Sequence, residues 1–259
     1  DCASVLVTFN GKSFDLNLLE TRFLLHGQAN PFTEIPHLDL LHPCRNLWNL
    51  DLENCRLQTL EREILHFFRE DDTPGEEIPG IYFDFLRTGD PTGIAEVFEH
   101  NVYDIVSMVG VTMMLEQNYQ GIRPIPGESG LTMFSRGKMH ERLGDGNVAL
   151  ECYESALRAD LSSNRRSQLL SRMAGLHKKS EQWEQAVALW EQQISIAGVF
   201  RLEPYEELAK YYEHQCRDYA RAMDYVTSAL ALLPEHREKD RTALGYRLKR
   251  LQRKTEAVE

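Results

Sequence analysis

Hydrophobic and polar positions follow two periods along the first half of the chain. The β-branched and apolar run SVLVTF, residues 4–9, predicts a buried strand, and HLDLL, residues 37–41, predicts a short second strand. Residues 14–25, 57–68 and 93–117 carry apolar side chains three or four positions apart, which predicts helices. Strands mixed with helices indicate an α/β layer fold.

The second half of the chain is helical throughout, and its pattern repeats. Small residues recur at intervals of 37 and 36, each four positions before a bulky or apolar residue. The small residues are Ala149, Ala186 and Ala222, and the residues that follow them are Tyr153, Trp190 and Val226. This pattern resembles the tetratricopeptide repeat, in which small residues let two antiparallel helices approach. Three units and a final helix near residues 240–254 predict a short superhelix.

The two patterns meet at RPIPGESG, residues 123–130, where two prolines and two glycines interrupt the helices on both sides. We therefore expect an α/β domain at residues 1–123, a linker at 124–130 and helical repeats at 131–255. A length of 259 residues is sufficient for two domains of ordinary size.

Composition describes a globular protein without a membrane span. Hydrophobic residues make up 42% and charged residues 27% of the chain. The longest apolar run, VSMVGVTMML, has ten residues, too few to cross a bilayer. The five cysteines are far apart and form no Cys-x-x-Cys pair, which indicates neither a zinc site nor a disulfide framework. A reducing, cytoplasmic location fits these features best.

The net charge of −11 is unevenly distributed. Residues 1–125 carry 8 Lys and Arg against 20 Asp and Glu, a net charge of −12, whereas residues 126–259 carry 21 against 20. An acidic half is poorly suited to bind phosphates unaided, because cations supply most of the affinity for nucleic acid. Divalent metal ions in a carboxylate site could reverse the local charge. A solvated acidic surface would have the same composition.

The stretch TFNGKSFD, residues 8–15, lies between a predicted strand and a predicted helix, as the Gly-Lys-Ser of a phosphate-binding P-loop does. A P-loop also needs a glycine five positions before Gly11, and that position is Leu6. With one glycine the backbone cannot form the phosphate cradle. The P-loop interpretation therefore fails, and Asn-Gly-Lys-Ser reads as a tight turn.

The residues flanking this turn resemble the second motif of the DEDD exonuclease superfamily, which has the RNase H-like fold. The matching residues are Asn10, Phe14, Asp15, Leu16, Leu19 and Arg22, with Phe9 where related polymerase domains commonly have tyrosine. The third motif of that superfamily is a His or Tyr before an Asp on a later helix. His100 and Asp104 match it, and a separation of four places them on one helical face.

A longer series of residues resembles the YprB-like group of bacterial proteins, whose members tend to carry tetratricopeptide-like repeats after the nuclease-like domain. The residues that carry this resemblance are His37, Asp39, Leu40, Leu41, Arg45, Leu47, Trp48, Leu57, Thr59, Leu60, Glu61, Arg69, Asp72, Pro74, Gly75, Ile78 and Pro79. With the repeats, the resemblance covers nearly the whole chain.

The resemblance implies phosphodiester hydrolysis with two Mg²⁺ or Mn²⁺ ions, acting on a single strand or 3′ end of nucleic acid. Asp104 and Asp15 would be metal ligands, and His100 would take the proton from the attacking water. Asn10 and Phe14 would line the pocket for the terminal nucleotide.

Several of these residues have ordinary structural interpretations as well. Asp15 fits a helix N-cap, Phe14 fits a core position, and Asn101, a further candidate for substrate binding, could brace the neighbouring loop. Asp39 could join the site, or it could form hydrogen bonds at the end of its strand. His100 could be a structural histidine, and its spacing from Asp104 resembles that of the tyrosine-bearing DEDD class.

The first DEDD motif, Asp-x-Glu on the opening strand, has no match before residue 10, and the single Asp-Leu-Glu at 51–53 follows the second motif. We therefore expect a nuclease-like domain that is incomplete at its N-terminus, holds half of the metal ligands and is inactive as this chain. The alternative is a non-catalytic scaffold that binds a protein partner through the helical repeats.

Overall fold

The computed structural model describes residues 5–70, 73–120 and 128–256. It divides into two compact units, Asp1–Leu143 and Gly144–Glu259. Asp72 and residues 124–127 of the predicted linker lie outside the described residues.

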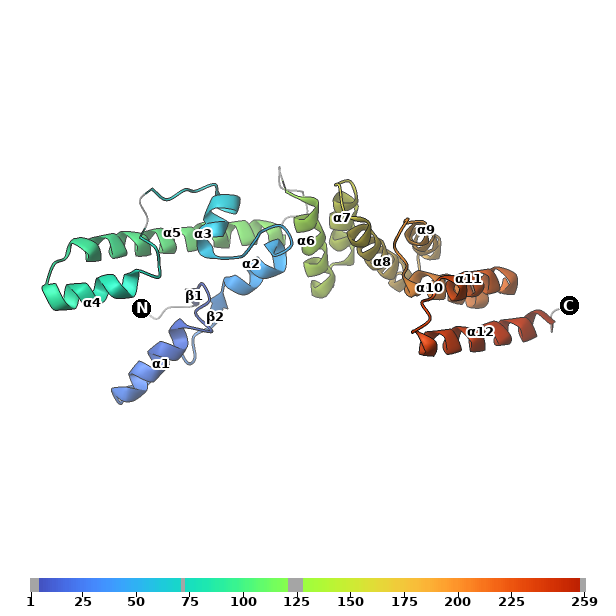
Figure 1. The fold of residues 1–259 in the computed structure, drawn as a ribbon, viewed down its shortest axis with the longest axis horizontal. Helices are drawn as coiled ribbons and strands as arrows, with labels where there is room; N and C mark the ends of the chain where they lie inside the picture. Colours follow the sequence, from blue (N-terminus) through green and yellow to red (C-terminus); the bar gives the residue numbers. More distant parts are fainter. Residues whose placement is uncertain (1–4, 71–72, 121–127, 257–259) are drawn as a thin grey trace. The chain divides into compact units, whose positions relative to one another are not determined.

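The first unit begins with a strand, a helix and a second strand, in the order that the sequence pattern predicts. The first strand is not buried as predicted, since Val5 is 47% and Val7 is 36% exposed. Strand β1 (Leu6–Thr8) pairs in parallel with β2 (His37–Asp39), and α1 (Asp15–Leu25) connects them (Figure 1). A parallel pair requires such a crossover connection, because the chain must return to the same end of the sheet. The sheet described has these two strands, so the fold is α/β with a small sheet.

Helices form the rest of the first unit. They are α2 (Leu41–Trp48), α3 (Leu57–Leu60), the π-helix η1 (Glu61–Leu65), α4 (Ile78–Thr88), α5 (Thr92–Gln120) and α6 (Gly130–Leu143). The sequence pattern did not predict α2 or α4. Each has a proline in its first turn, Pro43 and Pro79, where the missing N–H costs no helical hydrogen bond. Helix α6, which the pattern placed with the repeats, packs against α2 in the first unit.

The core of the first unit lies between α2, α3 and α5. Its buried residues are Leu40, Cys44, Leu47, Trp48, Leu60, Val111 and Leu115. Another side of α5 is also apolar but exposed, along Phe98, Val102, Ile105, Val106, Val109 and Met113. Helix α5 is therefore hydrophobic beyond its buried stripe, which is typical of a helix that is covered on more than one side.

The second unit consists of helices packed on their neighbours in sequence. They are α7 (Gly146–Leu157), α8 (Ser163–Lys179), α9 (Trp183–Ile194), α10 (Leu202–Tyr211), the π-helix η2 (Tyr212–Cys216), α11 (Tyr219–Leu232) and α12 (Glu238–Glu256) (Figure 1). Helix α8 packs on α9, α10 on α9 and α11, and α11 on α12.

The residues that define the sequence repeat are buried in this unit. Ala149, Ala186 and Ala222 are fully buried, and Tyr153, Trp190 and Val226 are at most 2% exposed. These positions therefore build the contacts between helices, as the pattern predicts. The assignment to the tetratricopeptide family itself stays a prediction.

Candidate active site

The turn after β1 is held by a carboxylate from β2. Asp39, which is 3% exposed, accepts hydrogen bonds from the backbone N–H of Asn10 at 2.8 Å and of Lys12 at 3.0 Å on its two oxygens. It also accepts one from the N–H of Leu41 at 3.1 Å. Burial alone would raise the pKa of Asp39, but these three hydrogen bonds outweigh it and lower that pKa. Asp39 was considered either as part of the site or as a hydrogen-bond acceptor at the end of its strand, and the structure shows the hydrogen bonds.

This turn also explains the Gly-Lys-Ser sequence. Asn10 has a φ of 65°, and Gly11 is buried beside Thr8. Backbone N–H groups that a P-loop would direct at a phosphate are directed here at Asp39. The turn therefore binds a carboxylate of its own chain.

Replacing Gly11 by Ala tests how closely this turn is packed. A Cβ there would lie 2.5 Å from the side chain of Thr8, whose hydroxyl lies 2.7 Å from Nε2 of His37. We expect Gly11→Ala to lower the free energy of unfolding by about 1–3 kcal/mol in urea denaturation, because Thr8 cannot move without losing that contact. The matched control is Gly80→Ala in α4, where a Cβ meets nothing within 4 Å. It should change the free energy of unfolding by at most about 0.5 kcal/mol, since Gly80 lies in the first turn of that helix. Equal effects of the two variants would contradict the close packing.

The predicted residues around the turn are accessible. Phe14 is 64% exposed, so it is not a core residue. Asp15 is the first residue of α1 and is exposed, and Asn10 is partly buried. Asn101 is exposed on α5, nine positions after that helix begins.

The predicted His–Asp pair forms on α5. Nε2 of His100 lies 3.6 Å from Oδ2 of Asp104, one helical turn away. The side chain of His100 is 12% exposed and that of Asp104 is 36% exposed. The pair is therefore semi-buried, with the carboxylate reaching solvent.

A buried arginine joins this pair to a second carboxylate. Arg69 donates to both oxygens of Glu61, at 2.8 and 2.5 Å, and to Oδ1 of Asp104 at 2.5 Å. The side chains of Arg69 and Glu61 are 5% and 2% exposed. Burial alone would lower the pKa of Arg69, but the hydrogen bonds and charges of Glu61 and Asp104 raise it, so its charge is fixed.

Arg69 also determines which nitrogen of a neutral His100 ring carries the proton. Its Nη1 lies 3.2 Å from Nδ1 of His100, and an arginine N–H can only donate. Nδ1 is therefore the acceptor, and the proton of the neutral ring is on Nε2, facing Asp104. In this arrangement both ring nitrogens of His100 face a partner, because Nδ1 faces Arg69 and Nε2 faces Asp104.

Sequence reasoning gave Glu61 and Arg69 no role, although both are in the pattern of the YprB-like group. The local signal for Glu61 was weak, because a glutamate in a helical segment is usually solvated. Glu61 is nonetheless buried, at the start of the π-helix η1, which ends where His66 takes a left-handed φ of 52°. π-Helical turns are frequent at functional sites.

The described residues do not by themselves fit a two-metal centre. Among residues 5–70, 73–120 and 128–256, no group of three or more His, Cys, Asp or Glu side chains is placed to hold a metal ion. Arg69 already supplies a cation to Asp104 and Glu61. Asp15 on α1 and Asp104 on α5 are the two carboxylates left for metal ions, and a centre of two neighbouring ions uses more.

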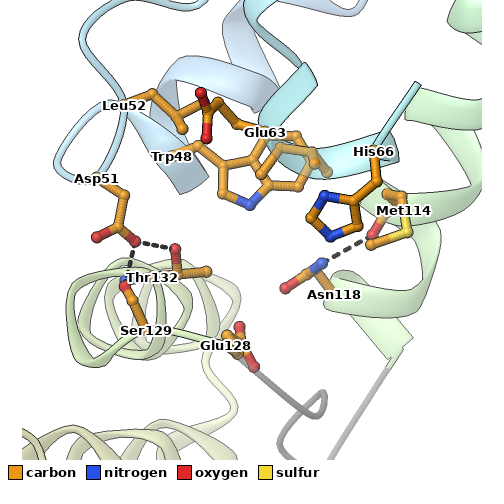
Figure 2. Close-up of a pocket in the computed structure, with 11 residues that line it drawn as sticks. Trp48, Asp51, Leu52, Glu63, His66, Met114, Asn118, Glu128, Ser129 and Thr132 are labelled. Atoms are coloured by element: carbon orange, nitrogen blue, oxygen red, sulfur yellow. Dashed lines mark hydrogen bonds between the residues drawn. The ribbon is translucent and has the colours of Figure 1, made fainter. Parts of the chain in front are cut away.

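The first unit also has a cavity of about 250 Å³ between α2, η1, α5 and α6. Figure 2 shows the Asp51 carboxylate accepting hydrogen bonds from the hydroxyls of Ser129 and Thr132 at one side of it. On the other side Asn118 donates to the carbonyl of Met114 at 2.8 Å. None of the predicted site residues lines this cavity, and the Asp-Leu-Glu at 51–53 begins in its wall, after α2.

Comparisons with known proteins agree with the resemblance read from the sequence. Residues 2–115 match the family model of the RNase_H superfamily. The chain is similar to the uncharacterized protein YprB of Bacillus subtilis (strain 168), with 30% identity over 257 residues. That alignment covers 96% of this chain and 60% of the relative, so the chain spans less than two thirds of the relative's length. In the described part of the chain, no helix has both the length and the apolar character needed to cross a membrane.

Proposed function

We propose that this chain, which carries an RNase_H superfamily domain followed by a mostly helical region, works in the hydrolysis of nucleic-acid phosphodiester bonds as a 3′–5′ exonuclease-type protein. The observation that carries the proposal is the His100–Asp104 pair, 3.6 Å apart on α5 within that domain. A histidine beside a partly exposed carboxylate is suited to move a proton once its Nδ1 no longer accepts from Arg69.

Asp15 and Asp104 are the carboxylates that this chain offers to Mg²⁺ or Mn²⁺ in the proposal. Both reach solvent, as a ligand to an incoming ion must. Because they are fewer than a two-metal site uses, we expect the 259-residue chain alone to degrade no nucleic acid.

Other residues of the chain orient and bind in this proposal. Arg69 fixes Asp104 and the ring of His100 through its hydrogen bonds. Phe14 offers an exposed ring on which a terminal base can stack, and Asn10 and Asn101 offer side-chain amide groups that can bind a nucleotide.

Degradation of labelled single strands in Mn²⁺ by the protein expressed from its complete gene tests this function. We expect Asp104→Asn to reduce the rate on the order of 100-fold or more, because a carboxylate at the reacting centre is lost. Asp84→Asn is the matched control, since Asp84 pairs with Arg87 on the exposed surface of α4. An Asp104→Asn rate equal to that of Asp84→Asn would rule out the catalytic role.

A non-catalytic scaffold is the second candidate. The observation that favours it is Arg69, which pairs with both Glu61 and Asp104 where a nuclease would need free carboxylates. The helical region would then bind a protein partner. Under this alternative, the complete protein degrades neither DNA nor RNA strands in Mg²⁺ or Mn²⁺, whichever residue is changed.

A further inference from the structure

A pocket in the second unit is lined mainly by cations and aromatic rings. Its volume is about 370 Å³, within the usual size of ligand sites. Lys178 of α8, Lys210 of α10, and Arg247 and Arg250 of α12 line it together with Trp183 and Tyr211.

Two carboxylates hold the cations of this pocket. Glu207 accepts hydrogen bonds from Lys178 and from Lys210, the latter at 2.7 Å. Glu213, whose side chain is 0% exposed, accepts from three further cations. These are Arg247 at 3.1 Å, Arg250 at 2.7 Å and Lys254 at 2.9 Å.

An excess of positive charge remains on this cluster, which consists of Lys178, Lys210, Arg247, Arg250 and Lys254 with Glu207 and Glu213. Five cations share two carboxylates, which leaves a net charge of +3 even with both glutamates ionised. Burial alone would raise the pKa of each glutamate, but the hydrogen-bonded cations lower both. The glutamates therefore stay charged and hold the cations in place before a ligand arrives. Arg250 is half exposed, and Lys178 and Lys210 are about 40% exposed, so an anion can reach them.

Two aromatic rings lie beside these cations. The rings of Trp183 and Tyr211 have centroids 5.9 Å apart and planes inclined by 31°. Trp48 and Trp190 are buried, whereas Trp183 is partly exposed and lines the pocket. A partly exposed ring among cations suits single-stranded nucleic acid, since phosphates can pair with the charges and a base can stack on the ring.

The positive charge continues along α12. Between residues 247 and 254 the helix carries five Lys and Arg and no Asp or Glu. At 1.5 Å per residue this segment is about 10 Å long, so it presents cations along a path rather than at a point. A polyanion fits such a segment better than a single anion does.

We infer that this pocket and the adjoining 247–254 segment bind a single strand of nucleic acid, with phosphates on Lys210 and Arg250 and a base on Trp183. The inference rests on the proposed function, which requires a polyanionic substrate. Residues 1–125 have a net charge of −12 and are poorly suited to bind that substrate unaided, so a cationic surface elsewhere in the chain supplies the affinity. An acidic peptide would pair with the cations but would offer no base to stack on Trp183.

The test is the binding of a fluorescein-labelled single strand of about 20 nucleotides to the full chain, measured by anisotropy in EDTA so that no metal-dependent cleavage occurs. The variant Lys210→Gln with Arg250→Gln leaves Lys178 on Glu207, and Arg247 and Lys254 on Glu213, so neither carboxylate loses all its partners. We expect weaker binding and a plot of log Kobs against log salt whose slope is shallower by about 1.4, or 0.7 for each lost phosphate contact.

Lys179→Gln with Lys239→Gln is the matched control, because both lysines are exposed in the second unit and are not part of the cluster. It changes the net charge equally and should leave the slope unchanged. Trp183→Leu should weaken binding about fivefold or more, and should remove the quenching of tryptophan fluorescence that the strand causes.

Equal binding by the cluster variant and the control, or displacement of the strand by polyglutamate of matched length at equal concentration, would overturn the inference. The outcome is separable from that of the proposed function. A strand that binds through the cluster but is never degraded by the complete protein would contradict the nuclease proposal and support the binding site. Degradation without binding at the cluster would support the nuclease proposal and contradict the binding site.

Discussion

Arg69→Met should lower the free energy of unfolding of the first unit by about 3–5 kcal/mol, because it leaves Glu61 charged, buried and without its bidentate partner. The side chain of Glu61 is 2% exposed, and both of its oxygens accept hydrogen bonds from Arg69. Asp104 contributes less to this loss because it is 36% exposed and water can replace Arg69 there. Urea denaturation followed by circular dichroism measures the change from the midpoint and slope of the transition.

The control for this prediction is Arg62→Met, since Arg62 pairs with Glu63 in the same helical segment but both side chains are about half exposed. That pair should contribute at most about 1 kcal/mol. Combining Arg69→Met with Glu61→Gln should recover part of the loss, because the buried charge is then removed with its partner. If Arg69→Met costs no more than Arg62→Met, the cluster does not stabilise the unit.

The parts of the fold that the sequence predicted are those with a local signal. The strands at β1 and β2 and helices α1 and α5 follow from apolar periodicity over neighbouring residues. Helix α2 was missed because Leu40 and Leu41 read as the end of a strand and Pro43 reads as a break. Its apolar face becomes clear only once Leu47 and Trp48 pack against Val111 and Leu115 of α5, more than sixty positions away.

At the site, too, the residues that could be predicted are those with a local signal. His100 and Asp104 were predicted together because a separation of four on a helix brings side chains together whatever the rest of the fold does. Arg69 approaches them from 31 and 35 positions away, with α4 between, and binds Glu61 as well, and no local pattern encodes that approach. Asp39 could be assigned to the strand end only when the parallel register placed it opposite Thr8, next to the turn at Asn10.

Glu213→Gln should destabilise the second unit by about 3 kcal/mol at pH 7. The side chain of Glu213 is 0% exposed and joins Arg247, Arg250 and Lys254 of α12 to η2, so its charge holds the last helix on the array. The loss is at the low end for a buried ion pair because the three cations are partly exposed and can be solvated. The exposed Glu235→Gln, in the connection before α12, is the control and should change stability by less than about 0.5 kcal/mol.

The pH dependence of that loss separates the charge of Glu213 from its packing. The hydrogen bonds and charges of Arg250 and Lys254 hold the pKa of Glu213 below its ordinary value of about 4.3, despite burial. A carboxyl whose pKa is lowered by folding stabilises fully above its unfolded pKa and loses that contribution as the pH falls through its folded pKa. The gap between the native chain and Glu213→Gln should therefore be constant from pH 7 to about 5 and should close below about pH 4. A gap that stays the same down to pH 2 would show that shape, and not charge, is what Glu213 contributes.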